Sequence, residues 1–500
     1  MAARTQRARA THVGVLQPDI TETIARLLPG PDAFAAFVAA LPAWAKTPLL
    51  ASIARLLVAP SMAVAWPTIT VLSPQLDSAT IEDLVAAATL GPCSIVIGYT
   101  IETHDDLAVV ADVASSITSL KFDLDGTSKT TLRFFRSTIA SCTHLASLEL
   151  KDSTWGEALR TLKGVFFKLE HLTSLALLNS SGDGDVELST GFCERLVHWL
   201  QTRPVVSLKM YAVHFADAPD SPLCLVLYDA ISSSTTLALD CVNILEHSFM
   251  HQRPLPVHLT SLEWDPSDFD NAYQSWYDFQ GALEDGPQLT HLSCKNFVKL
   301  LDDDDDEIPR VLQGLSSLAI HCKATSYEVL NALKTMSNLT ALVLQDIGFK
   351  GEVMRDFVGV LRKLPYLEVL KFPGDFKQVK DGDAMSTTDV VHLLQHVPRF
   401  ACLAHLDVAD HKLDMTSILG LLPTLNAAAK RLQKIRLQSR WQQGDVEAFV
   451  AAVGQLLDRH FAIVFDPRVV DAATNAHHKL LIEKSGLAPR RGVAKCIVYV

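Results

Sequence analysis

The sequence predicts an α/β solenoid in which short strands and helices alternate and each repeat stacks on the next. A six-residue apolar phrase recurs along the chain, its copies keep a nearly regular spacing, and helical patterns lie between them. One strand and one helix of this length cannot bury their own apolar faces, whereas stacked copies share a continuous core. We therefore expect a horseshoe with strands on its concave side and helices outside.

The recurring phrase carries apolar residues at its first, fourth and sixth positions, which is typical of a strand that buries one face. Clear copies begin at Ile117, Leu145, Leu172, Leu259, Leu289, Leu315, Leu339, Leu367, Leu403 and Leu432. Poorer copies begin at Val205 and Ser234, and weaker units begin at Trp66, Pro92 and His460. The mean step from Ile117 to Leu432 is about 29 residues, which predicts roughly 12 to 15 repeats.

Stretches with helical spacing lie between the copies. Residues 352–364, 387–397 and 445–457 each carry apolar side chains on one helical face, and Pro365 and Pro398 end the first two. Stacked strands should then bring the fourth positions into one inward row. Its expected members are Leu120, Leu148, Leu175, Leu262, Leu292, Leu318, Leu342, Leu370 and Leu406.

Ten clear copies in phase with helical stretches resemble the leucine-rich-repeat family, particularly its long, helix-containing, intracellular type. The resemblance runs from residue 66 to about 465 and implies a horseshoe-shaped solenoid. One feature departs from the family, which usually has Asn or Cys near the ninth position. That position here holds Asp125, Ser153, Ser180, Ser267, Phe297, Lys323 and Ile347. The turns are therefore expected to be less regular than those of the family.

The first 60 residues hold no copy of the phrase and predict a helical hairpin. Pro18 suits the first turn of one helix, a Pro-Gly-Pro break at 29–31 ends it, and Asp32 can cap the next. Each helix has one apolar face. These faces consist of Ile20, Ile24, Leu27 and Leu28 in the first helix and Phe34, Phe37, Val38 and Leu41 in the second.

This hairpin resembles an F-box. Leu16-x-Pro18-Asp19-Ile20 stands where the family has Leu-Pro-x-Glu-Ile, and Trp44 matches its late Trp, but the usual Val-Cys before that Trp is absent. The resemblance implies docking on the adaptor subunit of a cullin-type ubiquitin ligase. The implied contact residues are Leu16, Pro18, Ile20, Ile24, Leu27, Phe34 and Phe37. The alternative is a helical cap that covers the exposed end of the solenoid core.

Four regions follow from these patterns. Residues 1–14 are expected to be a disordered basic leader, although an Arg-rich start without acidic residues also resembles a mitochondrial presequence. Residues 15–60 form the F-box-like helical domain, 61–465 the leucine-rich-repeat solenoid, and 466–500 a C-terminal cap or tail.

Composition narrows the partners and the compartment. The 500 residues carry a net charge of −12, which argues against a general nucleic-acid or acidic-membrane surface. Nine cysteines include no Cys-x-x-Cys pair, which favours reduced thiols and a cytoplasmic or nuclear protein. The most apolar stretch, 34–58, is interrupted by prolines and charges, so no membrane span is expected.

The sequence offers no clear catalytic or metal-binding constellation. The acidic run 302–307 lacks the glycine and spaced ligands of a calcium loop. His247 and His251 are four residues apart but lack the Glu of a zincin helix, and His477-His478 has no further ligand nearby in sequence. Nucleotide-binding and nucleophile motifs are missing as well. We therefore expect neither an enzyme nor a cofactor.

Function is then expected to lie in surfaces. Outward strand positions carry charges of both signs, which suits a protein target of mixed polarity on the concave face. The candidate contact residues are Lys121, Glu149, Lys209, Tyr211, Glu263, His321, Lys371, His405, Asp407 and Arg436. The predicted function is a substrate-recognition adaptor of a cullin-type ubiquitin ligase. The alternative is a leucine-rich-repeat scaffold or regulatory sensor unconnected to ubiquitin.

Overall fold

The computed structural model describes most of the chain, with gaps. The described residues are 18–28, 31–59, 61–90, 93–153, 164–165, 167, 169–179, 186–211, 213–215, 222–231, 234–240, 254–265, 279, 281–283, 289–294, 310–321, 326–345, 347, 349–373, 385–409, 411, 413–428, 431–438, 443–455, 461–466, 472–487 and 495–499. Four predicted features lie outside them: the leader 1–14, Leu16, the acidic run 302–307, and the pair His247 and His251.

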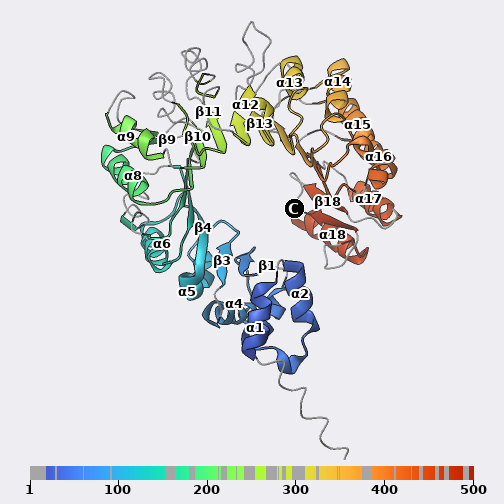
Figure 1. Ribbon diagram of the computed structural model, residues 1–500. Helices are drawn as coiled ribbons and strands as arrows, with labels where there is room; N and C mark the ends of the chain where they lie inside the picture. Colours follow the sequence, from blue (N-terminus) through green and yellow to red (C-terminus); the bar gives the residue numbers. More distant parts are fainter. Residues whose placement is uncertain are drawn as a thin grey trace, which may run out of the picture. The chain divides into compact units, whose positions relative to one another are not determined.

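The chain forms two compact units, Met1–Ser234 and Thr235–Val500. In both units, strands form a parallel sheet and the helices that connect them lie on one side of it (Figure 1). This mixed α/β arrangement with a long parallel sheet agrees with the fold class predicted from the repeats. The single horseshoe that would join all repeats stays a prediction.

The first unit begins with three helices, α1 (Pro18–Leu27), α2 (Pro31–Ala40) and α3 (Pro48–Leu56), which we call the N-terminal helical segment. The structure confirms the two predicted helices and adds α3. Thr47 caps α3 by accepting a hydrogen bond from the backbone N–H of Leu50 at 3.2 Å, and Pro48 occupies its first turn. The sequence analysis did not identify Thr47 and Pro48 as the start of a helix.

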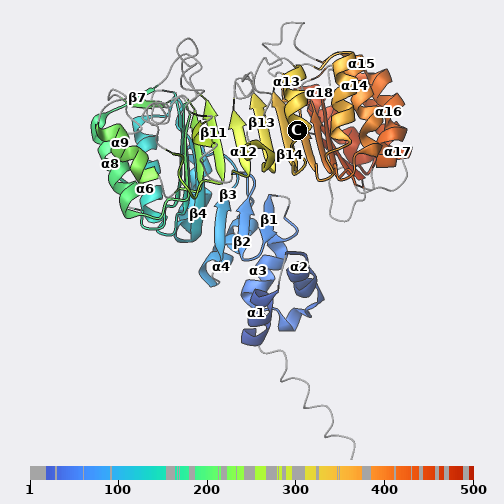
Figure 2. The same ribbon diagram turned by 45° about the horizontal axis from the view of Figure 1, so that its top comes forward.

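The sheet of the first unit contains one antiparallel pair and then parallel strands only. Figure 2 shows β1, β2 and β3 side by side at its beginning. Its strands are β1 (Met62–Ala65), β2 (Thr68–Val71), β3 (Ser94–Ile97), β4 (Ile117–Asp123), β5 (Ser147–Asp152), β6 (Ser174–Asn179) and β8 (Ser207–Tyr211). A separate pair joins β7 (Val186–Leu188) to β9 (Val213–Phe215). The helices that follow the strands are α4 (Ser78–Leu90), α5 (Ala108–Val113), α6 (Lys129–Ser141), α8 (Thr190–Thr202) and α9 (Pro222–Ile231).

The second unit repeats the same plan with parallel strands. They are β10 (Thr236–Asp240), β11 (Ser261–Asp265), β12 (His291–Cys294), β13 (Ser317–His321), β14 (Ala341–Gln345), β15 (Val369–Lys371), β16 (His405–Val408), β17 (Lys434–Gln438), β18 (Phe461–Asp466) and β19 (Lys495–Tyr499). Its helices are α12 (Arg310–Gln313), α13 (Ser326–Leu333), α14 (Glu352–Leu361), α15 (Thr387–His396), α16 (Met415–Ala428), α17 (Gln443–Gln455) and α18 (Ala472–Lys484). Because β19 pairs with β18, the parallel sheet continues beyond residue 465.

Strand register places the fourth positions of the phrase opposite one another. In the first unit the paired residues are Leu120, Leu148, Leu175 and Leu208. In the second unit they are Leu237, Leu262, Leu292, Leu318, Leu342, Leu370, Leu406, Ile435, Ile463 and Ile497. Leu318 and Leu342 are 0% exposed, so these rows belong to the core. The predicted members of the row therefore align within each unit.

Hydroxyl groups at the second position of the phrase form what we call the hydroxyl ladder. The Thr260 hydroxyl donates to the carbonyl of Thr235 at 3.1 Å, and the Thr290 hydroxyl donates to that of Thr260 at 3.0 Å. The series continues from Ser316 to the carbonyl of Thr290 at 3.0 Å and from Thr340 to that of Ser316 at 2.9 Å. In these four consecutive repeats of the second unit, each hydroxyl thus binds a backbone acceptor of the repeat before it, which explains why Thr and Ser recur here.

Candidate protein-interaction surfaces

The side of each sheet that faces away from the helices is built from the third and fifth positions of the phrase, because side chains alternate along a strand. In the second unit, Ala319 pairs in register with Val343, and Ala341 pairs with Val369. These four residues, which we call the apolar centre, are half-buried. They lie on β13, β14 and β15, and they offer apolar surface next to charged and polar residues of the same face.

Charged and polar residues flank the apolar centre. Val343 pairs in register with Lys371 on β15, and the same row continues to Asp407 on β16 and Arg436 on β17. Glu263 lies at the fifth position of β11, on the opposite side of the apolar centre. His405 lies two residues before Asp407 on β16 (His405–Val408), so both side chains are on the same face of the sheet. We call Glu263, Lys371, His405, Asp407 and Arg436 the charged rim. Five residues from the sequence prediction therefore lie on strands to either side of a patch that the prediction did not include, with β12 between Glu263 and this patch.

The charged rim contains both signs. Arg436 Nη1 lies 3.3 Å from Asp407 Oδ2, while the other oxygen of Asp407 accepts a hydrogen bond from the backbone N–H of Ala409 at 3.1 Å. Lys371 is exposed. A solvent-accessible ion pair of this kind contributes about 0–1 kcal/mol to stability.

The corresponding face of the first unit is dominated by neighbouring charge pairs. Lys121 Nζ lies 3.6 Å from Glu149 Oε2, and Lys151 Nζ lies 2.6 Å from Asp123 Oδ2. The hydrogen bond that Lys151 donates to the carboxylate of Asp123 raises the pKa of Lys151. These four charges form two ion pairs across β4 and β5, so this part of the face is charged.

Three other predicted contact residues lie apart from these pairs. Lys209 and Tyr211 are on β8, two strands beyond Glu149, and both are half-buried. His321 is the last residue of β13, and its side chain lies outside the described part of the structure. The sequence prediction also missed Asp123 and Lys151, because both follow the six-residue phrase. Extending the alternation by one residue past the phrase would have found them.

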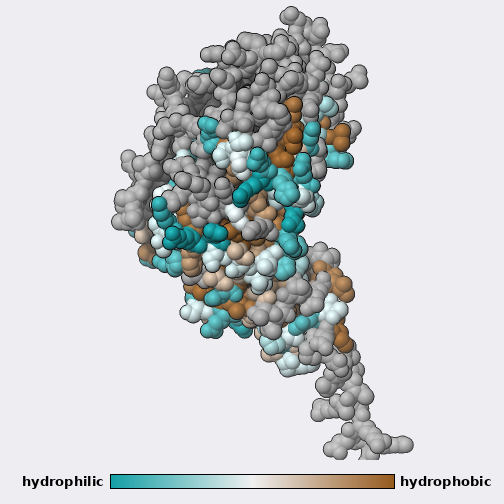
Figure 3. Space-filling model, turned by 90° about the vertical axis from the view of Figure 1, so that its left-hand side faces the viewer, coloured by the Kyte–Doolittle hydropathy of each residue, from teal (hydrophilic) through white to brown (hydrophobic). Residues whose placement is uncertain are grey.

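Helix α1 carries an apolar stripe on its solvent side. Ile20, Ile24 and Leu27 are 42%, 39% and 77% exposed, and their spacing places them along one face of the helix. The small residues Thr21 and Ala25 face inward and are 0% and 1% exposed. Figure 3 shows hydrophobic side chains along one edge of this part of the molecule. An amphipathic helix normally has the opposite orientation.

Helix α2 fixes the segment to the first repeat. Phe34 is 1% exposed, and its ring stacks on that of Trp66 with centroids 5.2 Å apart. This burial corrects the expectation that Phe34 lies in a docking surface, because no partner can reach its ring in this arrangement. Phe37 is half-buried, and Pro18 begins α1.

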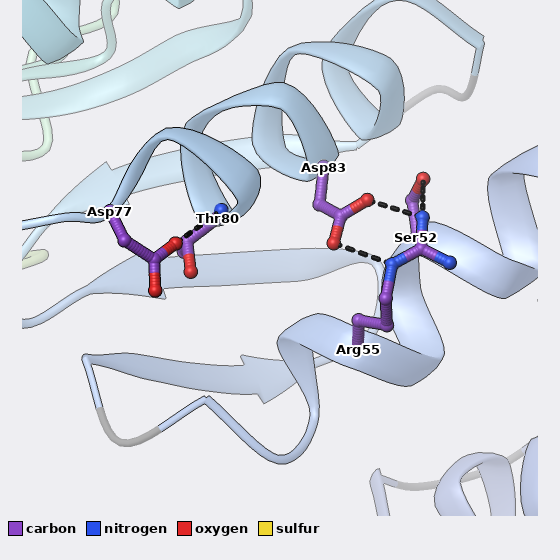
Figure 4. A network of polar contacts seen from close by, with 5 residues as sticks. All are labelled: Ser52, Arg55, Asp77, Thr80 and Asp83. Carbon is purple, nitrogen blue, oxygen red and sulfur yellow. Dashed lines mark hydrogen bonds and ion pairs between the residues drawn. The ribbon is translucent and has the colours of Figure 1, made fainter.

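A second attachment joins α3 to α4 (Figure 4). Arg55 on α3 donates two hydrogen bonds to the carboxylate of Asp83 on α4, one of them from Nε at 2.7 Å, and a third to the Ser52 hydroxyl at 3.3 Å. The hydrogen bonds from Arg55 lower the pKa of Asp83, and the same contact raises the pKa of Arg55. The N-terminal helical segment is thus docked on the repeats through both an aromatic stack and an ion pair.

Two negative findings concern the described residues alone. No group of three or more His, Cys, Asp or Glu side chains among them is placed to hold a metal ion. Within the same residues, no helix has the length and apolar character needed to cross a bilayer.

Comparisons with known proteins gave matches among solved structures alone. No protein-family model matches the chain, and no curated protein matches it. Among solved structures, the leucine-rich repeat-containing protein LegL7 from Legionella pneumophila is similar, with 17% sequence identity. The match covers 78% of this chain and 98% of that chain, with a TM-score of 0.32. At this identity and TM-score, the match assigns no function to this chain.

Proposed function

We propose that this chain is a protein-interaction scaffold of the leucine-rich-repeat type, whose protein partner binds the sheet face over β13–β15. The observation that carries the proposal is the apolar centre with residues of the charged rim on both sides of it along the sheet. Protein interfaces commonly combine an apolar core, where a few residues contribute most of the binding energy, with a polar rim that excludes water. The proposal assigns no catalytic step to the chain.

The charges favour a protein over a nucleic acid as the partner. The rim holds the acidic residues Glu263 and Asp407 as well as the basic residues Lys371 and Arg436, so it does not present the continuous positive surface that phosphate groups require. The whole chain has a net charge of −12, which adds repulsion toward a polyanion. A partner with an apolar anchor and charges of both signs matches this face best.

Replacing Val343 with Arg should abolish this interaction without unfolding the protein. The side chain is half-buried on the outward face, so the larger, charged group enters the binding surface and not the core. We expect purified chain to retain specific proteins from a cell extract, and V343R to lose a subset of them while its melting temperature stays unchanged.

Gln395→Arg is the matched control, since it adds the same charge at an exposed site on helix α15. Proteins that Q395R retains and V343R loses are the partners of the apolar centre. If V343R retains every protein that the wild-type chain retains, the proposed binding face is wrong.

A second candidate function is the substrate-recognition adaptor of a cullin-type ubiquitin ligase. It is favoured by the outward apolar stripe of α1, because a stripe that the fold leaves in solvent usually marks an interface. The F-box resemblance supplies the class of partner, the adaptor subunit of the ligase. The cap alternative is supported by Phe34 and Trp66, which attach the same segment to the repeats. Adaptor docking and capping of the solenoid are compatible, because docking would use the exposed stripe of α1 whereas capping uses the buried contact between Phe34 and Trp66.

The double variant Ile24→Asp and Leu27→Asp tests the adaptor role. Both side chains are exposed, so charges there should prevent docking on purified adaptor subunit and leave the melting temperature nearly unchanged. Val58→Asp is the control, because Val58 is 68% exposed outside the stripe. Absence of adaptor binding by the wild-type chain, or undiminished binding by the double variant, would exclude this role.

A further inference from the structure

Two histidines lie one turn apart on helix α15, away from the sheet face. His392 and His396 occupy positions i and i+4 and therefore share one side of the helix. Both side chains are half-buried, and their ring centroids are 4.7 Å apart with an interplanar angle of 51°. We propose that this pair binds a transition-metal ion of the zinc class, with water completing the coordination shell.

The spacing of the rings fits shared coordination. With a zinc–nitrogen bond of about 2.05 Å and a ring radius of about 1.15 Å, two imidazoles on one ion have centroids about 4.5 Å apart at a right angle and about 5.2 Å apart at the tetrahedral angle. The observed 4.7 Å lies between these values. The separation of the two rings is therefore compatible with two imidazoles on one ion.

A hydrogen bond fixes which nitrogen of His396 is available. Its Nδ1 lies 2.9 Å from the backbone carbonyl oxygen of His392, and a carbonyl can only accept. Nδ1 therefore carries the proton when the ring is neutral, and Nε2 retains its lone pair. Histidines that bind metals usually donate their other ring N–H to such an acceptor, which holds the ring in place.

Charges of both signs lie near the pair. Burial, His396 and Arg355 lower the pKa of His392, while Asp389 acts in the opposite direction. Arg355 opposes a dication and Asp389, one turn earlier on α15, favours it. The carboxylate of Asp389 already accepts from Ser386 at 2.6 Å, so it acts through its charge and not as a ligand.

The ligand chemistry selects the class of ion. Two imidazoles suit Zn²⁺, Cu²⁺ or Ni²⁺, whereas Ca²⁺ and Mg²⁺ require several oxygen ligands. The rings of His144 and His171 also lie close together, stacked nearly parallel at 12°, but their centroids are 5.5 Å apart, which is longer than both of the separations expected for two imidazoles on one ion. This second pair provides an internal control in the same chain.

The test measures how Zn²⁺ protects individual histidines of the full-length, metal-free chain from diethyl pyrocarbonate, with mass spectrometry to assign each modified residue. We expect Zn²⁺, but not Mg²⁺, to protect His392 and His396 and to leave His144 and His171 reactive. His396→Asn should weaken the protection of His392 by roughly tenfold or more in Zn²⁺ concentration, since even outer-shell partners of metal ligands contribute about 10–100-fold.

His144→Asn is the control and should leave the protection of His392 unchanged. Circular dichroism would verify that H396N keeps its helical content. Equal reactivity of His392 with and without Zn²⁺ would overturn the proposal. Protection that persists undiminished in H396N would overturn it as well, because His392 would then bind zinc without its neighbour.

Discussion

Replacing Leu318 with Ala is expected to lower the free energy of unfolding by about 2–5 kcal/mol. Leu318 is 0% exposed and pairs in register with Leu292 on one side and Leu342 on the other. Removal of its branched side chain leaves a cavity inside the row that joins consecutive repeats, and strands on both sides restrict its collapse. Urea denaturation followed by circular dichroism measures the loss.

Ser317→Ala provides the matched control for L318A. Ser317 is the preceding residue on β13, but it is half-buried on the opposite face of the strand. Substitutions outside the core usually change stability by less than about 0.5 kcal/mol. If S317A and L318A lower the urea midpoint equally, the assignment of the two faces is incorrect.

Acidification from pH 7 to pH 5 is expected to destabilise the second unit by about 2 kcal/mol through His411 alone. Burial lowers the pKa of His411 from 6.5 to about 4, although the nearby carboxylate of Asp407 acts in the opposite direction. The residue is 7% exposed, and its ring meets that of Phe372 edge-on at 6.0 Å. The folded state therefore holds the neutral ring.

Acid destabilises the fold because His411 binds a proton more readily in the unfolded state than in the folded state. The unfolded chain takes up a proton on His411 near pH 6.5, whereas the folded chain does so only near pH 4. The stabilisation is complete above pH 6.5 and is lost as the pH falls toward 4. His411→Phe keeps an aromatic ring beside Phe372 and removes the titrating group. The difference between the urea midpoints at pH 7 and pH 5 should shrink in H411F, and an unchanged difference would contradict the assignment.

Much of the fold could be predicted because one period determines both the strands and their register. Leu318 and Leu342 occupy the same position of the phrase, so aligning the copies is equivalent to pairing the strands. The hydroxyl ladder could not be recognised in this way, since Thr and Ser also fit an exposed strand. Strand β19 was missed because its core residue, Ile497, lies in a segment without the recurring leucines.

The interaction surfaces were only partly accessible from the sequence. Charged residues of the rim were identified because polar side chains at outward positions stand out. Val343 was not, since an apolar residue among apolar residues gives no signal until register places it beside Ala319 on the open face. Periodicity likewise identified the stripe of Ile20, Ile24 and Leu27, but it cannot tell which side of a helix meets water. That depends on the packing of Phe34 and Trp66.

The hydroxyl ladder has a consequence for how the chain can change in length. Every rung uses a hydroxyl from one repeat and a carbonyl at the same position in the repeat before it, so all rungs are chemically equivalent. Removal of one whole repeat would place the Thr340 hydroxyl against the carbonyl of Thr290, with donor and acceptor still matched. Duplication or loss of complete repeats therefore preserves the backbone hydrogen bonding, whereas a shift of a few residues disrupts it. The ladder makes the whole repeat, and not the single residue, the unit in which this chain can be lengthened or shortened.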